Sequence, residues 1–101
     1  MRSFLYEFEW DPTKAHTNFG KHGVNFERAA EVFHDPLALT IRDDEHSARE
    51  ARWITVGRDA RGQYVLVVHT FGQTNESTAR IRIISARKPV RSEIRQYEEQ
   101  S

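Results

Sequence analysis

Hydrophobic and polar residues alternate along much of the chain, which is the pattern of strands that bury one face. Phe4 to Trp10 alternates in this way, and shorter runs follow at Leu37 to Ile41 and Arg52 to Val56. Gln63 to Thr70 is nearly all apolar, which predicts a central strand covered on both faces. Thr78 to Ser85 returns to alternation. These runs predict an opening strand and a later group of four.

Three helices are predicted by capping residues and prolines. The first begins at Asp11-Pro12 and ends near Gly20 after about two turns. Asn25 can cap a second helix that Asp35-Pro36 ends, and Pro89 begins the last one. The predicted order is β-α-α-β-β-β-β-α. It indicates a single domain over residues 1–101 with an α+β fold, in which helices flank a small antiparallel sheet.

Composition narrows the class of protein. A chain of 101 residues with 38% hydrophobic and 30% charged residues predicts one soluble globular domain. It has no cysteine, which excludes disulfides, a thiolate nucleophile and a cysteine zinc site. The first residues lack the apolar run of a signal peptide, and no stretch is apolar enough to cross a membrane. We therefore expect a cytoplasmic protein with no membrane partner.

Charge is unevenly distributed along this chain of zero net charge. Residues 1–60 hold 8 Lys+Arg and 11 Asp+Glu, a balance of −3, whereas residues 61–101 hold 7 and 4, a balance of +3. Between Arg80 and Arg95, six residues are basic and one, Glu93, is acidic. A local basic patch fits an enzyme that acts on nucleic acid, and equally a docking surface for an acidic partner.

The alternation Arg80-Ile81-Arg82-Ile83 places two guanidinium groups on one face of a strand and two aliphatic side chains on the other. Neighbouring guanidinium groups repel one another, so such a pair suits an anion, and the planar fork fits phosphate oxygens well. The first interpretation is therefore a phosphodiester-binding strand. The second is an exposed basic face neutralised by acidic residues nearby, and the pattern leaves both open.

Two histidines are candidates for proton transfer near neutral pH. His69 ends the apolar strand, and His22 follows Lys21 in a turn where the pair could contact phosphate. Each also has a structural interpretation, as a histidine satisfied at a strand end or a solvated turn. His46-Ser47-x-x-Glu50 has the pattern of a capping box, and we interpret it as the start of a helix.

No metal or cofactor site is predicted. The five histidines have no short paired spacing, and the run Asp43-Asp44-Glu45 lacks the alternating ligands and glycine of a calcium loop. The chain also has no glycine-rich phosphate loop and no Gly-x-Ser-x-Gly motif.

Five segments, in order and covering nearly the whole chain, resemble the BrnT toxin family. One such segment would be weak, but the five together are specific. They are Phe8-Glu-Trp10-Asp-Pro12-x-Lys14-Ala, Asn18-x-x-Lys21-His22-Gly23-Val24-x-Phe26-Glu27-x-Ala29, Val32-Phe33-x-Asp35-Pro36, His46-Ser47-x-x-Glu50-x-Arg52-Trp53 and Ile81-Arg82-Ile83-Ile84-Ser85-Ala86-Arg87.

The resemblance implies a RelE-like toxin of a bacterial type II toxin–antitoxin system. Such toxins cleave RNA without a metal ion and arrest translation. The implied partner is a BrnA-like antitoxin with a ribbon-helix-helix domain, in an assembly of two toxins and two antitoxins. Operator DNA would be bound only through the antitoxin. Many relatives have an arginine just after the strand that ends here at Thr70, where this chain has Phe71-Gly72, and often a tyrosine at the position of His69.

A metal-independent ribonuclease needs a base for the ribose 2′-OH, cations for the phosphate and an acid for the leaving oxygen. With the resemblance in view, we assign Arg80 and Arg82 to the phosphate, and His69 to proton transfer with His22 as the alternate. The residues expected to hold backbone phosphates are Lys21, Arg87 and Lys88. The alternative function is a non-catalytic interaction module that binds an acidic partner or acts only as a co-repressor.

Overall fold

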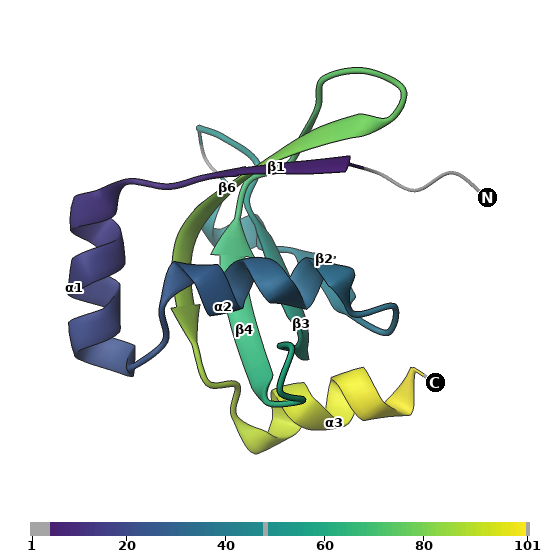
Figure 1. Cartoon of the computed structure of the whole chain (residues 1–101). Coiled ribbons are helices and arrows are strands. Elements are labelled where there is room, and N and C mark those ends of the chain that lie inside the picture. Colours follow the sequence, from purple (N-terminus) through teal and green to yellow (C-terminus); the bar gives the residue numbers. More distant parts are fainter. Residues whose placement is uncertain (1–4, 48, 101) are drawn as a thin grey trace.

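The computed structural model describes residues 5–47 and 49–100, so the prediction for Phe4 lies outside it. In this part of the chain, six strands and three α-helices form an α+β fold, which confirms the predicted class (Figure 1). The elements are β1 (Leu5–Glu9), α1 (Pro12–His22), α2 (Phe26–Glu31), the 3₁₀ helix η1 (Val32–His34), β2 (Leu39–Arg42), the 3₁₀ helix η2 (Asp44–His46), β3 (Trp53–Arg58), β4 (Tyr64–His69), β5 (Gly72–Gln73), β6 (Thr78–Arg87) and α3 (Arg91–Glu99).

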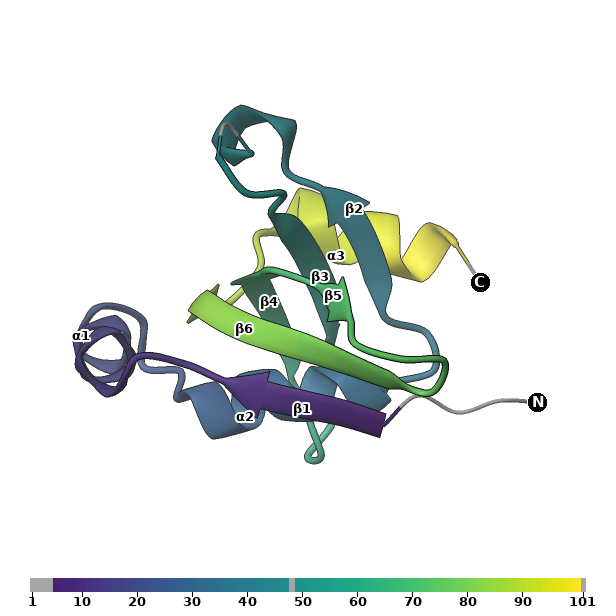
Figure 2. The same ribbon diagram turned by 90° about the horizontal axis from the view of Figure 1, so that it is seen from above.

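The strands form one sheet in the order β1-β6-β4-β3-β2, with the short β5 also paired to β6. The neighbours among β2, β3, β4 and β6 are antiparallel, as predicted. β1 differs, because it lies parallel to β6 at the edge of the sheet (Figure 2). No tight turn joins these two strands, so the direction of β1 is not dictated by its connection.

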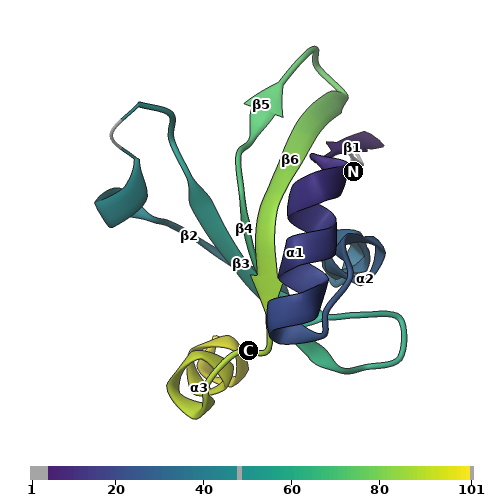
Figure 3. The ribbon, with the colours of Figure 1, turned by 90° about the vertical axis from the view of Figure 1, so that its left-hand side faces the viewer.

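Helices cover both faces of the sheet. Figure 3 shows α1 and α2 on one side of it and α3 on the other. The larger core lies on the side of α1 and α2; its buried residues are Val24, Phe26, Ala29, Val32, Val65, Val67, Ile81, Ile83 and Ala86. A smaller cluster of Val56, Leu66 and Tyr97 fixes α3 to the other face. Past the end of β4, the pair β2–β3 diverges from β5 and β6 (Figure 3).

α1 is longer than the two turns predicted from Gly20. The helix continues through Gly20 and ends at Gly23, whose left-handed φ of 69° suits a glycine. Asp11 caps the first turn as predicted. The side-chain amide of Asn18 then donates to the carbonyl of Ala86 at 2.8 Å, which fixes the helix against β6.

The predicted capping box starts no helix. Ser47 instead follows η2, and its hydroxyl accepts a hydrogen bond from the N–H of Arg52 at 3.0 Å and donates to the carbonyl of Asp43. Glu50 points toward β6 rather than back to a helix start, since it pairs with Arg82. The sequence pattern of a capping box is present, but its side chains form tertiary contacts instead of capping a helix.

Candidate functional site

The alternation along β6 places Arg80 and Arg82 as the sequence predicts. Both are exposed, whereas Ile81 and Ile83 are buried in the larger core. The aliphatic neighbours hold the strand in the sheet, so the two guanidinium groups share the opposite face. This face is open to a ligand.

Three acidic residues are neighbours of this arginine pair, two by strand register and one by direct contact. In the parallel register, Glu7 is opposite Arg80 and Glu9 is opposite Arg82. Glu50, from the segment before β3, forms an ion pair with the guanidinium of Arg82. The basic face is therefore partly neutralised, which is a feature of the second sequence-based interpretation.

Arg80, Arg82, Glu9 and Glu50 surround one hollow of about 320 Å³. Its remaining walls are Ala51, which follows Glu50, and the segment from β4 to β5, with Thr70, Phe71 and Gly72. We name it the arginine hollow. Two anion-binding groups and two proton-accepting groups thus meet at one place on the surface.

Two further hollows that contain basic residues share lining residues with the arginine hollow or with each other. Arg82 also lines a hollow of about 220 Å³ with Lys14 and Arg52. Lys14 in turn lines a third, of about 280 Å³, with Lys21 and His22. The predicted residues Lys21 and His22 are therefore linked to the arginine pair only through Lys14 and Arg82, which line neighbouring hollows. They lie two hollows away from it, at the end of α1.

His69 lies elsewhere, in the interior on the side of α2. It is 1% exposed, and its ring packs edge-on against Phe33 with centroids 4.8 Å apart. Its Nδ1 lies 2.9 Å from the carbonyl of Thr70, and its Nε2 lies 2.7 Å from the hydroxyl of Thr55. A carbonyl only accepts, so Nδ1 donates and Nε2 accepts the Thr55 hydroxyl proton.

This environment keeps the His69 ring neutral. Burial lowers the pKa of His69 below its ordinary value, although the bond to the Thr70 carbonyl acts in the opposite direction. Both ring nitrogens are engaged, so the geometry favours the structural interpretation of His69 over proton transfer.

Arg87 and Lys88 are not among the residues that line these basic hollows. The guanidinium of Arg87 makes two hydrogen bonds of 2.9 Å to Glu93 at the start of α3. This fork lowers the pKa of Glu93 and raises that of Arg87. Lys88 is exposed, and its carbonyl accepts a further bond from Arg87.

Sequence reasoning missed the acidic half of the site, Glu9 and Glu50. Glu9 alternates with apolar residues in the opening strand, which only marks it as exposed. Glu50 was interpreted as part of a capping box. Their meeting with Arg82 depends on the pairing of β1 with β6 and on the approach of the segment before β3.

Two further observations concern the described residues as a whole. Among residues 5–47 and 49–100, no group of three or more His, Asp or Glu side chains is arranged to hold a metal ion. The helices in the same part of the chain are too short and too polar to span a bilayer.

Similarity to known proteins agrees with the fold and with the motifs. A family model described as "Ribonuclease toxin, BrnT, of type II toxin-antitoxin system" matches residues 10–93. Among solved structures, the chain resembles the 1.1 Å crystal structure of the Brucella abortus ribonuclease toxin BrnT, with a TM-score of 0.55 and 18% identity. The similarity covers 90% of this chain and 100% of that one, and at this identity it shows a shared fold. No curated protein matches the chain.

Proposed function

The chain belongs to the BrnT family of ribonuclease toxins of type II toxin–antitoxin systems, and from this premise we propose that it cleaves RNA at the arginine hollow without a metal ion. The observation that carries the proposal is the meeting of Arg80, Arg82, Glu9 and Glu50 around one hollow. Guanidinium groups bind a phosphodiester and stabilise the charge that develops on it. Carboxylates can exchange the protons of the reaction.

In the proposed mechanism, Glu50 takes the proton of a ribose 2′-OH, whose oxygen attacks the adjacent phosphorus. Arg80 and Arg82 hold the non-bridging oxygens as negative charge accumulates, a contribution of about 3–4 kcal/mol to the barrier for each such group. The bond to the 5′-oxygen breaks, and this oxygen takes a proton from water, while the proton on Glu50 returns to the solvent. The products are a 2′,3′-cyclic phosphate end and a free 5′-OH. The requirement for a 2′-OH restricts the reaction to RNA.

The remaining basic residues have a binding role in this proposal. Lys14, Arg52 and Lys21 line the two further hollows, so they can hold the phosphates that flank the cleaved bond. Arg87 and Lys88, also expected to hold phosphates, lie beyond these hollows, and Arg87 is already paired with Glu93. We place them at the margin of the RNA path.

A type II toxin implies an antitoxin partner. We propose a BrnA-like antitoxin with a ribbon-helix-helix domain, in an assembly of two toxins and two antitoxins that binds operator DNA through the antitoxin, in the cytoplasm. Because the arginine hollow, with Arg80 and Arg82, is the proposed RNA-binding region, the antitoxin should cover part of it with acidic or apolar side chains. A co-structure in which these arginines remain open to solvent would contradict this arrangement.

The alternative function, a non-catalytic interaction module, is favoured by the ion pairs of the basic face. Arg82 is paired with Glu50 and Arg87 with Glu93, so both guanidinium groups have a structural explanation. A module of this kind would bind its partner and leave RNA intact.

The two functions differ in their effect on a cell. We expect the chain expressed alone to arrest growth and translation of a bacterial host, and co-expression with the neighbouring reading frame to restore growth. Unimpaired growth of a host that accumulates the folded protein would support the module instead.

A further inference from the structure

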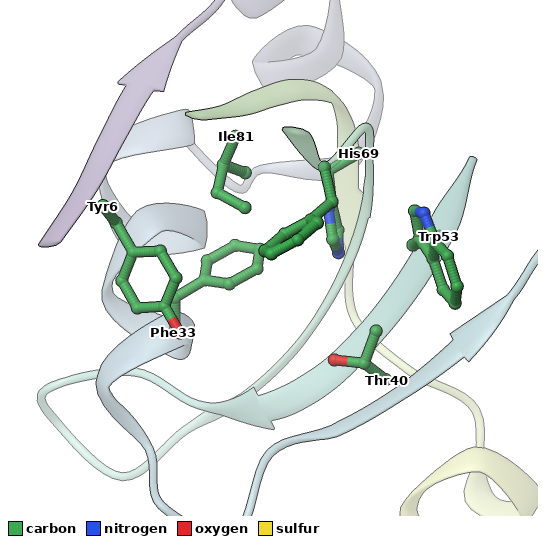
Figure 4. Close-up of a pocket in the computed structure, with 7 residues that line it drawn as sticks. Tyr6, Phe33, Thr40, Trp53, His69 and Ile81 are labelled. Carbon is green, nitrogen blue, oxygen red and sulfur yellow. The ribbon is translucent and has the colours of Figure 1, made fainter. Parts of the chain in front are cut away.

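A second, largely aromatic hollow of about 410 Å³ opens on the side of the sheet that carries α2 (Figure 4). We name it the aromatic hollow. Its walls come from six elements and the loop after β4; they are Tyr6, Phe33, Thr40, Trp53, His69, Phe71 and Ile81. Figure 4 shows Trp53 and Thr40 across the space from Tyr6 and Ile81. The size is that of a small-molecule site.

The hydrogen-bonding groups of Thr40 and His69 are already engaged within the fold. The hydroxyls of Thr40 and Thr55 lie 2.8 Å apart, and Thr55 in turn contacts Nε2 of His69. Nδ1 of His69 faces the carbonyl of Thr70. These two residues therefore offer an entering ligand mainly apolar surface, and most of the other walls are aromatic side chains.

The rim of the aromatic hollow is accessible. Phe71, which lines the hollow, is 45% exposed. Trp53 is half-buried, and the guanidinium carbon of Arg42 lies 6.0 Å from its ring centroid. A flat ligand that enters past Phe71 would meet the indole of Trp53.

Phe71 also lines the arginine hollow, so the two hollows share one wall. Arg80 and Arg82 face away from Ile81, so the two hollows lie on opposite faces of β6, and Phe71 stands between a phosphate in one and a planar ring in the other. A single-stranded nucleic acid has this combination of groups, with a charged phosphate on one side of the sugar and a stacking base on the other.

We propose that the aromatic hollow binds one unstacked nucleobase of the RNA, next to the phosphodiester held in the arginine hollow. The inference rests on the proposed function and adds a base-binding subsite to it. The subsite recognises the base through stacking, which every base can provide, so it tolerates different bases. It also requires a base that has left its duplex, so single-stranded RNA is the substrate class.

The test uses short single-stranded RNAs in which the residues flanking the cleaved bond are made abasic one at a time. For the wild-type protein, one abasic position should lower kcat/KM at least tenfold, as expected from the loss of one base–aromatic stack. For Trp53→Leu, the intact RNA should already be slow, and the same abasic position should cause little further loss. Trp53→Phe keeps an aromatic face and should retain most of the base dependence.

Two controls separate stacking from folding. Phe19 is 53% exposed on α1 and is not among the residues of either hollow, so Phe19→Leu should leave the effect of the abasic position unchanged. Melting temperatures of all variants identify any loss of cleavage that comes from unfolding. Trp53→Phe is the milder change, so it remains informative if Trp53→Leu unfolds.

A binding measurement tests the subsite without cleavage, using fluorescently labelled 2′-O-methyl oligonucleotides with and without the abasic position. If the wild type binds the abasic probe more weakly than the intact probe, and Trp53→Leu binds both equally, the subsite is supported. This holds even if no RNA is cleaved; the proposed ribonuclease activity would then be wrong and the base-binding subsite would stand. Equal binding of both probes to the wild type overturns the subsite. A Trp53→Leu variant with normal RNA binding but weakened antitoxin binding also overturns it, since the hollow would then receive a protein side chain.

Discussion

Arg82 on β6 forms an ion pair with Glu50, which lies 32 residues earlier in the chain. The pair places a cation and a proton acceptor in direct contact at the surface of the arginine hollow. A phosphodiester that enters competes with Glu50 for the guanidinium of Arg82. In the proposed mechanism, this exchange binds the phosphate to Arg82 and frees the Glu50 carboxylate to accept the 2′-OH proton.

The arginine pair should be functional rather than structural. We expect Arg80→Ala and Arg82→Ala each to abolish growth arrest while the melting temperature changes by only a few degrees, or about 1 kcal/mol, because both residues are exposed. Arg61→Ala, in the turn between β3 and β4, is the matched control and should remain toxic. Ile83→Ala should lose about 2–5 kcal/mol of unfolding free energy through a core cavity and lose toxicity by unfolding.

Growth assays beside melting curves give both quantities for all four variants. If Arg82→Ala remains fully toxic, or loses toxicity only because it melts, the arginines are structural and the active site lies elsewhere.

Glu50 should act as the base. Glu50→Gln keeps the shape of the side chain but cannot take the 2′-OH proton, so we expect single-turnover cleavage to fall by about 10²–10⁴-fold. Its stability should change by less than about 1 kcal/mol, because the ion pair is exposed to solvent. Glu45→Gln in η2 is the matched control. If Glu50→Gln cleaves at the wild-type rate, another group is the base. Glu9→Gln would then be tested in the same way.

His69 should have a pKa below the ordinary value of histidine. Its folded pKa is lowered by burial, so the fold favours the neutral ring, and this contribution to stability is complete above about pH 6.5 and is lost as the pH falls through the folded pKa. A titration followed by nitrogen-15 NMR should show a His69 pKa below the ordinary value of histidine, with the proton of the neutral ring on Nδ1. A His69 that titrates at or above its ordinary value would restore it as a candidate for proton transfer.

Asp35 and Tyr97 should stabilise the packing of α3 in a pH-dependent way. The Tyr97 hydroxyl donates to the Asp35 carboxylate at 2.7 Å, and the N–H of Arg58 donates to it at 2.8 Å. Burial acts to raise the pKa of Asp35, but these bonds and one from Leu37 outweigh it, so the net direction is downward. Burial and the bond to Asp35 raise the pKa of Tyr97 to about 12.

Because the folded pKa of Asp35 is the lower one, its contribution is present above about pH 3.9 and is lost as the pH falls through the folded value. We expect Tyr97→Phe to lower the free energy of unfolding in urea by about 1–2 kcal/mol at neutral pH, and by less near pH 2. In an Asp35→Asn background the cost should be smaller at neutral pH. An equal cost of Tyr97→Phe in both backgrounds would show that the two groups are not coupled.

The sequence predicted what depends on local pattern. Alternation placed Arg80 and Arg82 opposite Ile81 and Ile83, and Asp11 capped the helix that follows it. These features are set by neighbouring residues and the periods of strand and helix, so they can be predicted before the fold is known.

Features set by distant contacts could not be predicted. Glu50 reaches Arg82 only because β3 and β6 flank the same central strand, and no local pattern encodes that approach. The buried position of His69 depends on Phe33 and Thr55, which come from other elements. The parallel pairing that brings Glu9 beside Arg82 also depends on distant parts of the chain, since nothing near residue 9 specifies the direction of the partner strand.

The central claim is that this chain cleaves RNA at the arginine hollow without a metal ion. The most direct measurement incubates purified wild-type protein and Arg82→Ala with single-stranded RNA in EDTA and identifies the product ends by mass. We predict that the wild type yields 2′,3′-cyclic phosphate and 5′-OH ends, and that Arg82→Ala, equally folded, yields neither. Intact RNA with the wild type, or equal cleavage by both proteins, would contradict the account.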